Sequence, residues 1–279
     1  MKAERLVDGP VAVKRCLHGT MMYNPRDTFV GRSLDLYGEW CERELEVLGQ
    51  VIEPGDTVLD VGANIGTHTI FFARAVGPSG HVIAFEPQRA AYHLLCGNVA
   101  LNALHNVTCV RAAVSDERGD VAVPELDPSG EANFGAVAVG SGEDRVDAIP
   151  IDDLGLEACA LVKVDVEGME PRVLLGARET IARAKPALFV ECNTQRGARD
   201  VMRAVRLIGY RAYWHIAPYF REQNHFENGE NVFEAFQPEA NLLCVPAETP
   251  LTGLLAAEGD EDWQAALLRA AAMAEKARG

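Results

Sequence analysis

The sequence has no apolar run approaching the roughly 20 residues that a membrane-spanning helix requires. Its N-terminus, Met1-Lys-Ala-Glu-Arg, leads into no sustained apolar region of the kind that a secretory signal contains. We therefore expect a soluble, cytoplasmic protein that does not associate with membranes.

Basic residues are also scarce. The chain has 26 Lys and Arg against 41 Asp and Glu, which gives a formal net charge of −15. This charge opposes nonspecific binding to the phosphates of nucleic acids and to anionic lipids. We therefore expect a small molecule, and not a nucleic acid, as the binding partner.

The sequence contains no Cys-x-x-Cys, and its seven cysteines are odd in number and scattered. This pattern supports neither a disulfide framework nor a zinc site. Cys109, Cys192 and Cys244 fall inside apolar, strand-like runs, where a small hydrophobic side chain fits. We interpret the cysteines as buried thiols of a reducing compartment.

Internal repeats and low-complexity linkers are absent, and 279 residues suffice for one large α/β domain with extensions. Short apolar runs alternate with segments of helical periodicity, which predicts parallel strands joined by crossover helices. The expected strands cover residues 57–61, 81–85, 107–111, 160–165, 186–191, 210–215 and 241–246. The expected helices cover residues 66–76, 88–102, 170–182, 196–207 and 261–277. The sequence therefore predicts a Rossmann-like α/β fold: a seven-stranded, mostly parallel sheet with helices on both faces and an antiparallel last strand.

A glycine turn with an acid on either side is the most informative motif. The run Asp60-Val-Gly-Ala-Asn-Ile-Gly66 follows a strand, and Glu86 ends the next strand along the chain. A glycine turn lets backbone approach a ligand closely, and an acid at the neighbouring strand end can accept hydrogen bonds from ribose hydroxyls. The alternative is that Gly62 and Gly66 only form a tight turn between strand and helix.

The turn lacks the Gly-x-Gly-x-x-Gly pattern that holds a pyrophosphate. Asp60 would repel a pyrophosphate, but it suits a cofactor that carries an ammonium and a sulfonium. The motif therefore favours S-adenosylmethionine as the cofactor.

Several motifs, in order along the chain, resemble those of the FkbM-type methyltransferases. They are the segments 58–69, 84–87, 94–98, 113–116, 162–168 and 189–191. The resemblance covers residues 35–215 and implies a class I, S-adenosylmethionine-dependent methyltransferase, most often one that methylates a hydroxyl oxygen. It does not name the acceptor.

The same segments supply the expected cofactor site. Gly62, Asn64 and Gly66, with Thr67 after them, should shape the methionine end, Asp60 should act through its charge, and Glu86 should bind the ribose. On the adenine side we expect Ala113 to Ser115. By resemblance alone, Tyr37 and Glu39 should close over the methionine carboxylate or the acceptor. His68 fits either the cofactor site or a packing role.

This interpretation divides the chain into three consecutive parts, the second of which contains an insertion. We expect an N-terminal extension and leading helix over residues 1–45, a class I methyltransferase domain over 46–247, and a C-terminal helix over 248–279. Residues 119–151 break the alternation and predict a β-hairpin insertion, where acceptor-side residues of the resembling family tend to lie. The C-terminal helix should dock on the domain or form a homodimer contact.

Polar side chains at strand ends are the candidates for catalysis, because ligands of open α/β sheets bind outside the carboxyl ends of the strands. Methyl transfer to an alcohol needs the acceptor held in line and a general base within hydrogen-bond reach. Asp165, Glu167, Glu191 and His215 each end or follow an apolar run. The alternatives are helix capping for the acids and a hydrogen-bonded aromatic rim for His215.

A Mg²⁺ site is a further alternative, because Asp165 with Glu191 or Asn193 would offer hard oxygen ligands at neighbouring strand ends. The resembling family does not require it. The leading function is O-methylation of a hydroxyl on a sugar or natural product. An N-methyltransferase and a catalytically silent S-adenosylmethionine-binding partner protein are the competing functions.

Overall fold

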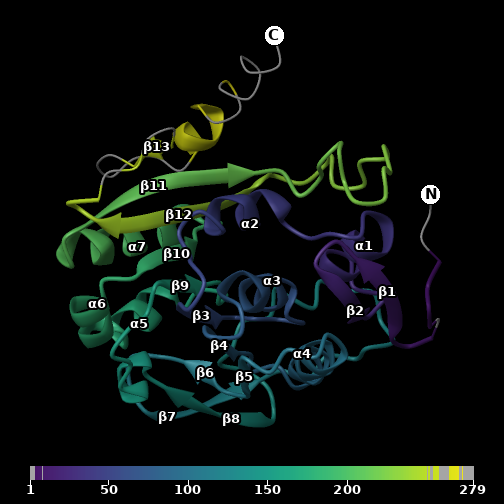
Figure 1. Cartoon of the computed structure of the whole chain (residues 1–279), viewed down its shortest axis with the longest axis horizontal. Helices are drawn as coiled ribbons and strands as arrows, with labels where there is room; N and C mark the ends of the chain where they lie inside the picture. Colours follow the sequence, from purple (N-terminus) through teal and green to yellow (C-terminus); the bar gives the residue numbers. More distant parts are fainter. Residues whose placement is uncertain are drawn as a thin grey trace.

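The computed structural model describes residues 4–7, 9–249, 251, 254–257, 264–269 and 272. An eight-stranded sheet forms the centre of the molecule, in the order β13-β11-β12-β10-β9-β3-β4-β5 (Figure 1). Its strands are β3 (Thr57–Val61), β4 (His81–Phe85), β5 (Val107–Val110), β9 (Leu161–Val164), β10 (Ala187–Glu191), β11 (Tyr210–Ala217), β12 (Glu239–Pro246) and β13 (Leu255–Ala256).

All seven expected strands form, and the two-residue β13 adds an eighth by pairing with the edge of β11. Strands β5, β4, β3, β9 and β10 are parallel neighbours, whereas β12 runs antiparallel between β10 and β11. The chain builds outward from β3 through β4 to β5 and then crosses back to β9. The order of the strands therefore reverses between β3 and β9, where an open α/β sheet forms its ligand crevice.

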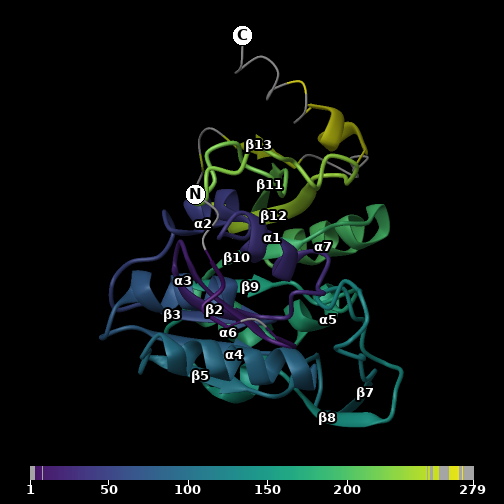
Figure 2. The same cartoon turned by 90° about the vertical axis from the view of Figure 1, so that its right-hand side faces the viewer.

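Helices cover both faces of the sheet, as predicted. Helices α2 (Glu42–Leu48), α3 (Thr67–Val76) and α4 (Arg89–Leu101) lie on one face. The opposite face, which buries the largest apolar cluster, is covered by α5 (Glu170–Leu175), α6 (Arg178–Ala184) and α7 (Gln195–Leu207) (Figure 2). None of the helices in the described part of the chain is long and apolar enough to span a membrane.

One expected helix is split in two. Residues 170–182 were expected as a single helix, but α5 ends at Leu175 and α6 begins at Arg178. A Cβ at Gly176 would lie 2.0 Å from the carbonyl oxygen of Ser115, so the backbone packs directly against the loop after the third core strand. This tertiary contact accounts for the break.

The expected hairpin insertion is present. Strands β7 (Gly119–Val123) and β8 (Asp144–Ile149) pair antiparallel, and the short β6 (Ala113–Val114) pairs parallel with β8. The 3₁₀ turn Ile151–Leu154 returns the chain to the main sheet. The residues between β7 and β8 form a loop that reaches the ligand crevice.

The N-terminal extension contains the hairpin of β1 (Ala12–Cys16) and β2 (Gly19–Tyr23), and also the helix α1 (Val30–Leu36), which the sequence analysis did not predict. The hairpin packs on α4, where Asn98 accepts a hydrogen bond from the Met22 N–H (2.6 Å) and donates one to the Met22 carbonyl (2.9 Å). Asn102 makes the same pair of bonds with the backbone of Thr20. The extension is thus fixed to the main sheet by the surface of α4.

The expected C-terminal helix lies only partly within the described residues. Residues 264–269 are helical, and Ala266 is fully buried against the apolar cluster beside β11. The remainder of the expected helix, including Ala271 and Met273, lies outside the described residues. Docking of the described turn is therefore observed, while a homodimer contact stays a prediction.

Candidate active site

A cavity of about 320 Å³ opens at the carboxyl ends of β3, β4, β9 and β10. Its floor contains the residues that end or follow these strands: Gly62, Glu86, Asp165 and Glu191. The antiparallel strand β12 adds Glu239, because its first residue lies where the parallel strands finish. The five strand ends thus bring together residues that are up to 178 positions apart in the sequence.

The glycine turn after β3 is built for close backbone approach. Gly62 has φ +83°, and a Cβ there would lie only 1.8 Å from the carbonyl oxygen of Asp165. Asn64 also adopts a left-handed conformation, with φ +49°. The turn therefore exposes backbone to the cavity at the point where β3 and β9 separate.

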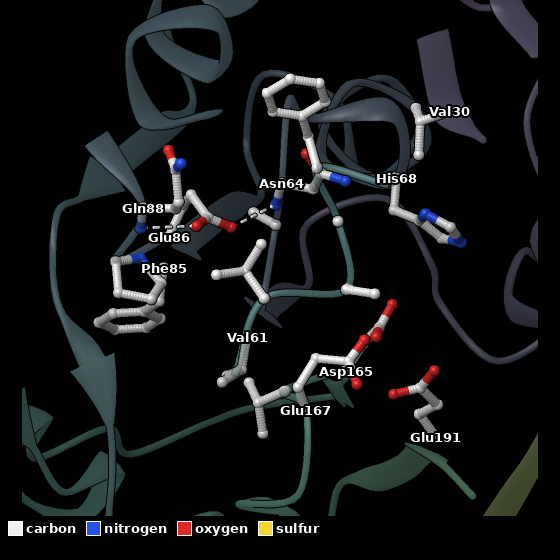
Figure 3. A pocket seen from close by; sticks show the side chains of 18 of the residues that line it. Val30, Val61, Asn64, His68, Phe85, Glu86, Gln88, Asp165, Glu167 and Glu191 are labelled. Carbon is white, nitrogen blue, oxygen red and sulfur yellow. Dashed lines mark hydrogen bonds between the residues drawn. The ribbon is translucent and has the colours of Figure 1, made fainter. Parts of the chain in front are cut away.

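Glu86 is held in place by backbone donors. Its two carboxylate oxygens accept hydrogen bonds from the N–H groups of Asn64 and Gln88, both at 2.8 Å (Figure 3). Burial raises the pKa of Glu86 to about 7, although the two backbone bonds oppose the shift. Each oxygen keeps a second lone pair, so the carboxylate can accept bonds from two ligand hydroxyls.

Lys163 is a buried cation beneath the cavity. Its ammonium lies 3.0 Å from Asp165 Oδ2 and 3.7 Å from Asp60 Oδ1, and its side chain is 3% exposed. Burial opposes the charge, but the carboxylates of Asp165 and Asp60 raise the pKa of Lys163 above its usual value. Asp60 also accepts a hydrogen bond from the Thr69 hydroxyl at 2.6 Å. The lysine therefore stays charged and fixes the two aspartates.

Asp165 and Glu191 form a hydrogen-bonded carboxyl pair on the side of the cavity opposite Glu86 (Figure 3). Burial raises the pKa of Asp165, but Lys163 outweighs it and holds this pKa below its usual value. Burial and the negative charge of Asp165 raise the pKa of Glu191 well above its usual range. Glu191 therefore has the higher pKa of the two carboxyl groups, and the amide of Asn193 also donates a hydrogen bond to Glu191.

A second buried group adjoins this pair. Glu239 accepts a hydrogen bond from the Cys41 thiol (3.0 Å), and Glu44 accepts one from the Asn241 amide (2.8 Å) and contacts His68 Nε2 at 3.1 Å. Burial raises the pKa of Glu44 to about 7 and that of Glu239 well above its usual range. The cavity floor is therefore rich in carboxyl groups that burial keeps partly protonated.

Comparison with known proteins decides the family. The methyltransferase FkbM domain matches residues 60–241, which is most of the chain and includes all five strand ends of the cavity. The chain belongs to the FkbM methyltransferases.

Two curated relatives agree with this family. Methyltransferase sdnD of Sordaria araneosa is 31% identical over 183 residues, which cover 53% of this chain and 70% of the relative. The hexuronic acid methyltransferase AglP of Haloferax volcanii is 33% identical over 177 residues, covering 62% of this chain and 70% of the relative. A solved structure, methyltransferase FkbM from Methylobacillus flagellatus, is 18% identical, covers 72% of this chain and 50% of its own, and superposes with a TM-score of 0.45.

As an FkbM methyltransferase, the protein is a transferase that uses S-adenosylmethionine, and the cofactor half of the cavity fits that molecule. The exposed backbone of the glycine turn and the two open lone pairs of Glu86 are suited to the methionine and ribose parts. Six other expected cofactor and catalytic residues also line the cavity: Asn64, Thr67, Ala113, Asp165, Glu167 and Glu191.

Several expected site residues of this FkbM methyltransferase lie outside the cavity lining. The Tyr37 hydroxyl donates to the Glu230 carbonyl (2.7 Å) and accepts from the Val232 N–H (3.0 Å), so it braces the β11–β12 loop instead of closing over the cofactor. Ser115 is buried and donates to Asp116. Gly66, with φ +90°, caps α3 behind the turn.

Asp60 and His215 also differ from their expected positions. Asp60 is fully buried beneath the cavity, where Thr69 and Lys163 take up its charge, so it does not line the ligand space. His215 is the register partner of Asn241 on β11 and packs on Phe189, at 5.6 Å between ring centroids. His215 is buried and is not among the residues that line the cavity, so its role as a general base stays a prediction that this geometry does not support.

The expected Mg²⁺ ligands do not fit a metal ion. The Asp165 carboxylate is paired with the Lys163 ammonium, and Glu191 is engaged by both Asp165 and Asn193. A cation bound there would have to approach a buried ammonium, which electrostatic repulsion opposes.

Aromatic side chains form the wall above the acids. Trp40 stacks on Tyr219, with ring centroids 5.4 Å apart and planes at 20°, and Phe29 contacts Tyr219 edge-on at 5.5 Å. Phe134, on the insertion loop, lines the same space. The Asn133-Phe-Gly135 segment of the expected insertion therefore reaches the cavity.

The sequence analysis missed Lys163, Glu239, Trp40 and Tyr219 as cavity residues. A lysine inside the apolar run Leu161-Val-Lys-Val164 was an available signal, because a buried ammonium needs carboxylate partners. Glu239 precedes an apolar strand, and only the antiparallel direction of that strand brings its start to the cavity. Trp40 and Tyr219 come from segments without a motif.

Proposed function

We propose that this protein transfers the methyl group of S-adenosylmethionine to a hydroxyl oxygen of a small molecule, a sugar or a related natural product. The observation that supports this proposal most directly is the pair of Asp165 and Glu191. The two carboxyl groups lie in the same cavity as Glu86, the expected ribose ligand, but on the opposite side of it. An alcohol loses its proton during methylation, so a carboxylate within reach is required. The name of the relative AglP, a hexuronic acid methyltransferase, supports a sugar acceptor.

In this proposal the cofactor supplies a methyl group on a positively charged sulfur, and the residues of the chain position the acceptor. Glu86 accepts hydrogen bonds from the ribose, and the backbone of the Gly62 turn lies against the methionine part. The cavity walls exclude water from the acceptor and fix its oxygen in line for displacement, which supplies much of the rate.

Glu191 is the proposed general base. Its pKa is raised by burial and by Asp165, whereas Lys163 lowers the pKa of Asp165, so Glu191 is the stronger base of the pair. A bound cofactor brings positive charge to the site and favours the ionised form of Glu191. Ionised Glu191 then accepts the hydroxyl proton on Oε and becomes a carboxylic acid, which can donate a hydrogen bond to Asp165, held by Lys163, while the Asn193 amide orients Glu191 throughout.

The experiment that tests this proposal compares Glu191→Gln with the parent enzyme and with Glu117→Gln, a control at an exposed acid. We expect Glu191→Gln to lower kcat by about 10²–10⁴-fold, the usual contribution of a general base. Affinity for S-adenosylhomocysteine, measured by calorimetry, should change little. Turnover of Glu191→Gln at the parent level with an identified acceptor would remove the base assignment. Tight binding of S-adenosylhomocysteine without transfer to any acceptor would instead favour a silent binding protein.

A further inference from the structure

The charges that line the cavity are strongly unbalanced. Five carboxyl groups line it: Glu86, Asp165, Glu167, Glu191 and Glu239. Among the described lining residues, Lys163 is the only lysine or arginine. His68 also lines the cavity, but burial and the nearby Lys163 lower its pKa to about 4, so its imidazole is neutral at physiological pH.

Lys163 has no capacity left for an anionic acceptor. Its ammonium lies 3.0 Å from Asp165 and 3.7 Å from Asp60, and the side chain is 3% exposed. Arg221, the arginine of the β11–β12 loop, donates hydrogen bonds from Nε and Nη2 to the two carboxylate oxygens of Glu39, both at 2.9 Å. A carboxylate or phosphate on the acceptor would therefore meet no free cation in the cavity.

The acids remain in surplus after the cofactor is taken into account. S-adenosylmethionine carries a sulfonium, an ammonium and a carboxylate, so its net charge of one offsets one carboxylate. Lys163 offsets another. Glu191 and Glu239 are still present in the lining, with pKa values raised by burial and by neighbouring carboxylates. A further positive charge beside such buried carboxyl groups stabilises their ionised form.

The aromatic part of the cavity lining is also suited to a cation. Trp40, Tyr219 and Phe29 line the cavity, with Trp40 stacked on Tyr219 and Phe29 packed against Tyr219, and Tyr219 lies within the electrostatic influence of Glu239 and Glu191. Aromatic faces attract organic ammonium groups, most strongly where water is excluded. The carboxyl groups of the floor and the aromatic wall thus favour the same kind of ligand.

From the charges and this wall we propose that the acceptor carries an ammonium group near the hydroxyl that is methylated, as an amino sugar or an amino alcohol does. Glu239 and Glu167 hold the ammonium against the Trp40–Tyr219 wall, which leaves Glu191 to accept the hydroxyl proton. This inference rests on the proposed function. The proposed acceptor is a cation, whereas the name of the relative AglP gives an acidic sugar, a hexuronic acid.

The test is a matched set of three hexoses that differ in charge: D-glucosamine, D-glucose and D-glucuronate. Each is titrated into the protein saturated with S-adenosylhomocysteine, and calorimetric heat, with tryptophan fluorescence as a second signal, reports binding. We expect glucosamine to bind at least about tenfold more tightly than glucose, and glucuronate to bind more weakly than glucose. Glu239→Gln should reduce the preference for glucosamine over glucose.

Glu157→Gln is the matched control, because Glu157 is exposed and precedes β9, at the sheet edge opposite the cavity. It should leave the preference unchanged. Equal binding of the three hexoses, tighter binding of glucuronate, or no saturable response to glucosamine would each overturn the inference. Failure of the proposed function is distinguishable, since it would show as S-adenosylhomocysteine binding without methyl transfer to any acceptor, whatever its charge.

Discussion

Glu86 combines a structural role with the ribose-binding role proposed for it. Two backbone N–H groups fix its orientation, and burial raises its pKa to about 7, so it is half ionised near neutral pH. The charged form is the better acceptor for ribose hydroxyls. Cofactor binding should therefore be coupled to the ionisation of this one residue.

We expect affinity for S-adenosylhomocysteine to rise as the pH increases through 7 and to level off above it, because ribose binding favours the carboxylate. Glu86→Gln should remove this component of the pH dependence and weaken binding by about 10–100-fold, the cost of losing a charged hydrogen-bond acceptor. Calorimetric titrations at several pH values measure both effects. An unchanged pH profile in Glu86→Gln would contradict the assignment of the pH dependence to this residue.

At the scale of elements, the turn after β3 is constrained by its neighbour β9. The backbone of Asp165 occupies the space that a side chain at position 62 would need. Because β3 and β9 flank the reversal of strand order, this contact also sets the width of the ligand crevice.

We expect Gly62→Ala to destabilise the fold by more than about 2 kcal/mol and to abolish cofactor binding, since the new Cβ would clash with the Asp165 carbonyl and φ is +83°. Gly155→Ala is the control, because Gly155 has a left-handed backbone with φ +60° but nothing within 4 Å of its added Cβ. It should cost only about 1 kcal/mol, from backbone strain alone. Urea denaturation gives both values, and equal losses in the two variants would show that the close approach to Asp165 has no energetic effect.

The elements also show what sequence patterns can predict. The strands β3, β4, β9 and β10 were predicted closely, because continuous apolar runs mark strands that are buried on both faces. Helix α1 was missed, since its seven residues form too short a segment for helical periodicity to be distinctive. The break after α5 depends on the contact of Gly176 with Ser115, which no local pattern encodes.

At the scale of the whole molecule, the cavity is assembled from distant parts of the chain. The Thr28 N–H donates to the Ala132 carbonyl (3.0 Å) and the Asn24 amide donates to the Pro128 carbonyl (3.0 Å), so the N-terminal segment holds the insertion loop. Phe29 and Phe134, which both line the cavity, come from these two segments. Similarly, the bidentate ion pair of Arg221 and Glu39 attaches the β11–β12 loop to the segment before α2.

The buried carboxyl groups predict how the stability of the whole protein depends on pH. The pKa values of Glu44 and Glu86 rise from 4.5 to about 7 on folding, so between these values the native state binds more protons than the unfolded state. Stability should therefore fall as the pH rises from about 5 to about 8, by at least about 2 kcal/mol. Urea denaturation of the cofactor-free protein across this range measures the slope.

The double variant Glu44→Gln, Glu239→Gln is the comparison for that slope, because it removes two of the raised carboxyl groups. Its stability should depend less steeply on pH than that of the parent. Asp165 does not affect how the unfolding free energy changes between pH 5 and pH 8. Because its pKa is lowered, it is ionised in both the folded and the unfolded state above about pH 5. A parent stability that rises with pH over this range would contradict the prediction.

The sequence by itself determined the family, the cofactor and the central sheet, because the glycine turn, the strand-end acids and the buried strands are local patterns with local physical causes. It also supplied Asp165 and Glu191 as neighbours, since parallel strands finish at one edge. Only the tertiary structure decided which acids face the ligand. Asp60 and His215 turn away from it, while Glu239 turns toward it, because burial, pairing with Lys163 and the reversed direction of β12 are set by contacts between segments far apart in the chain.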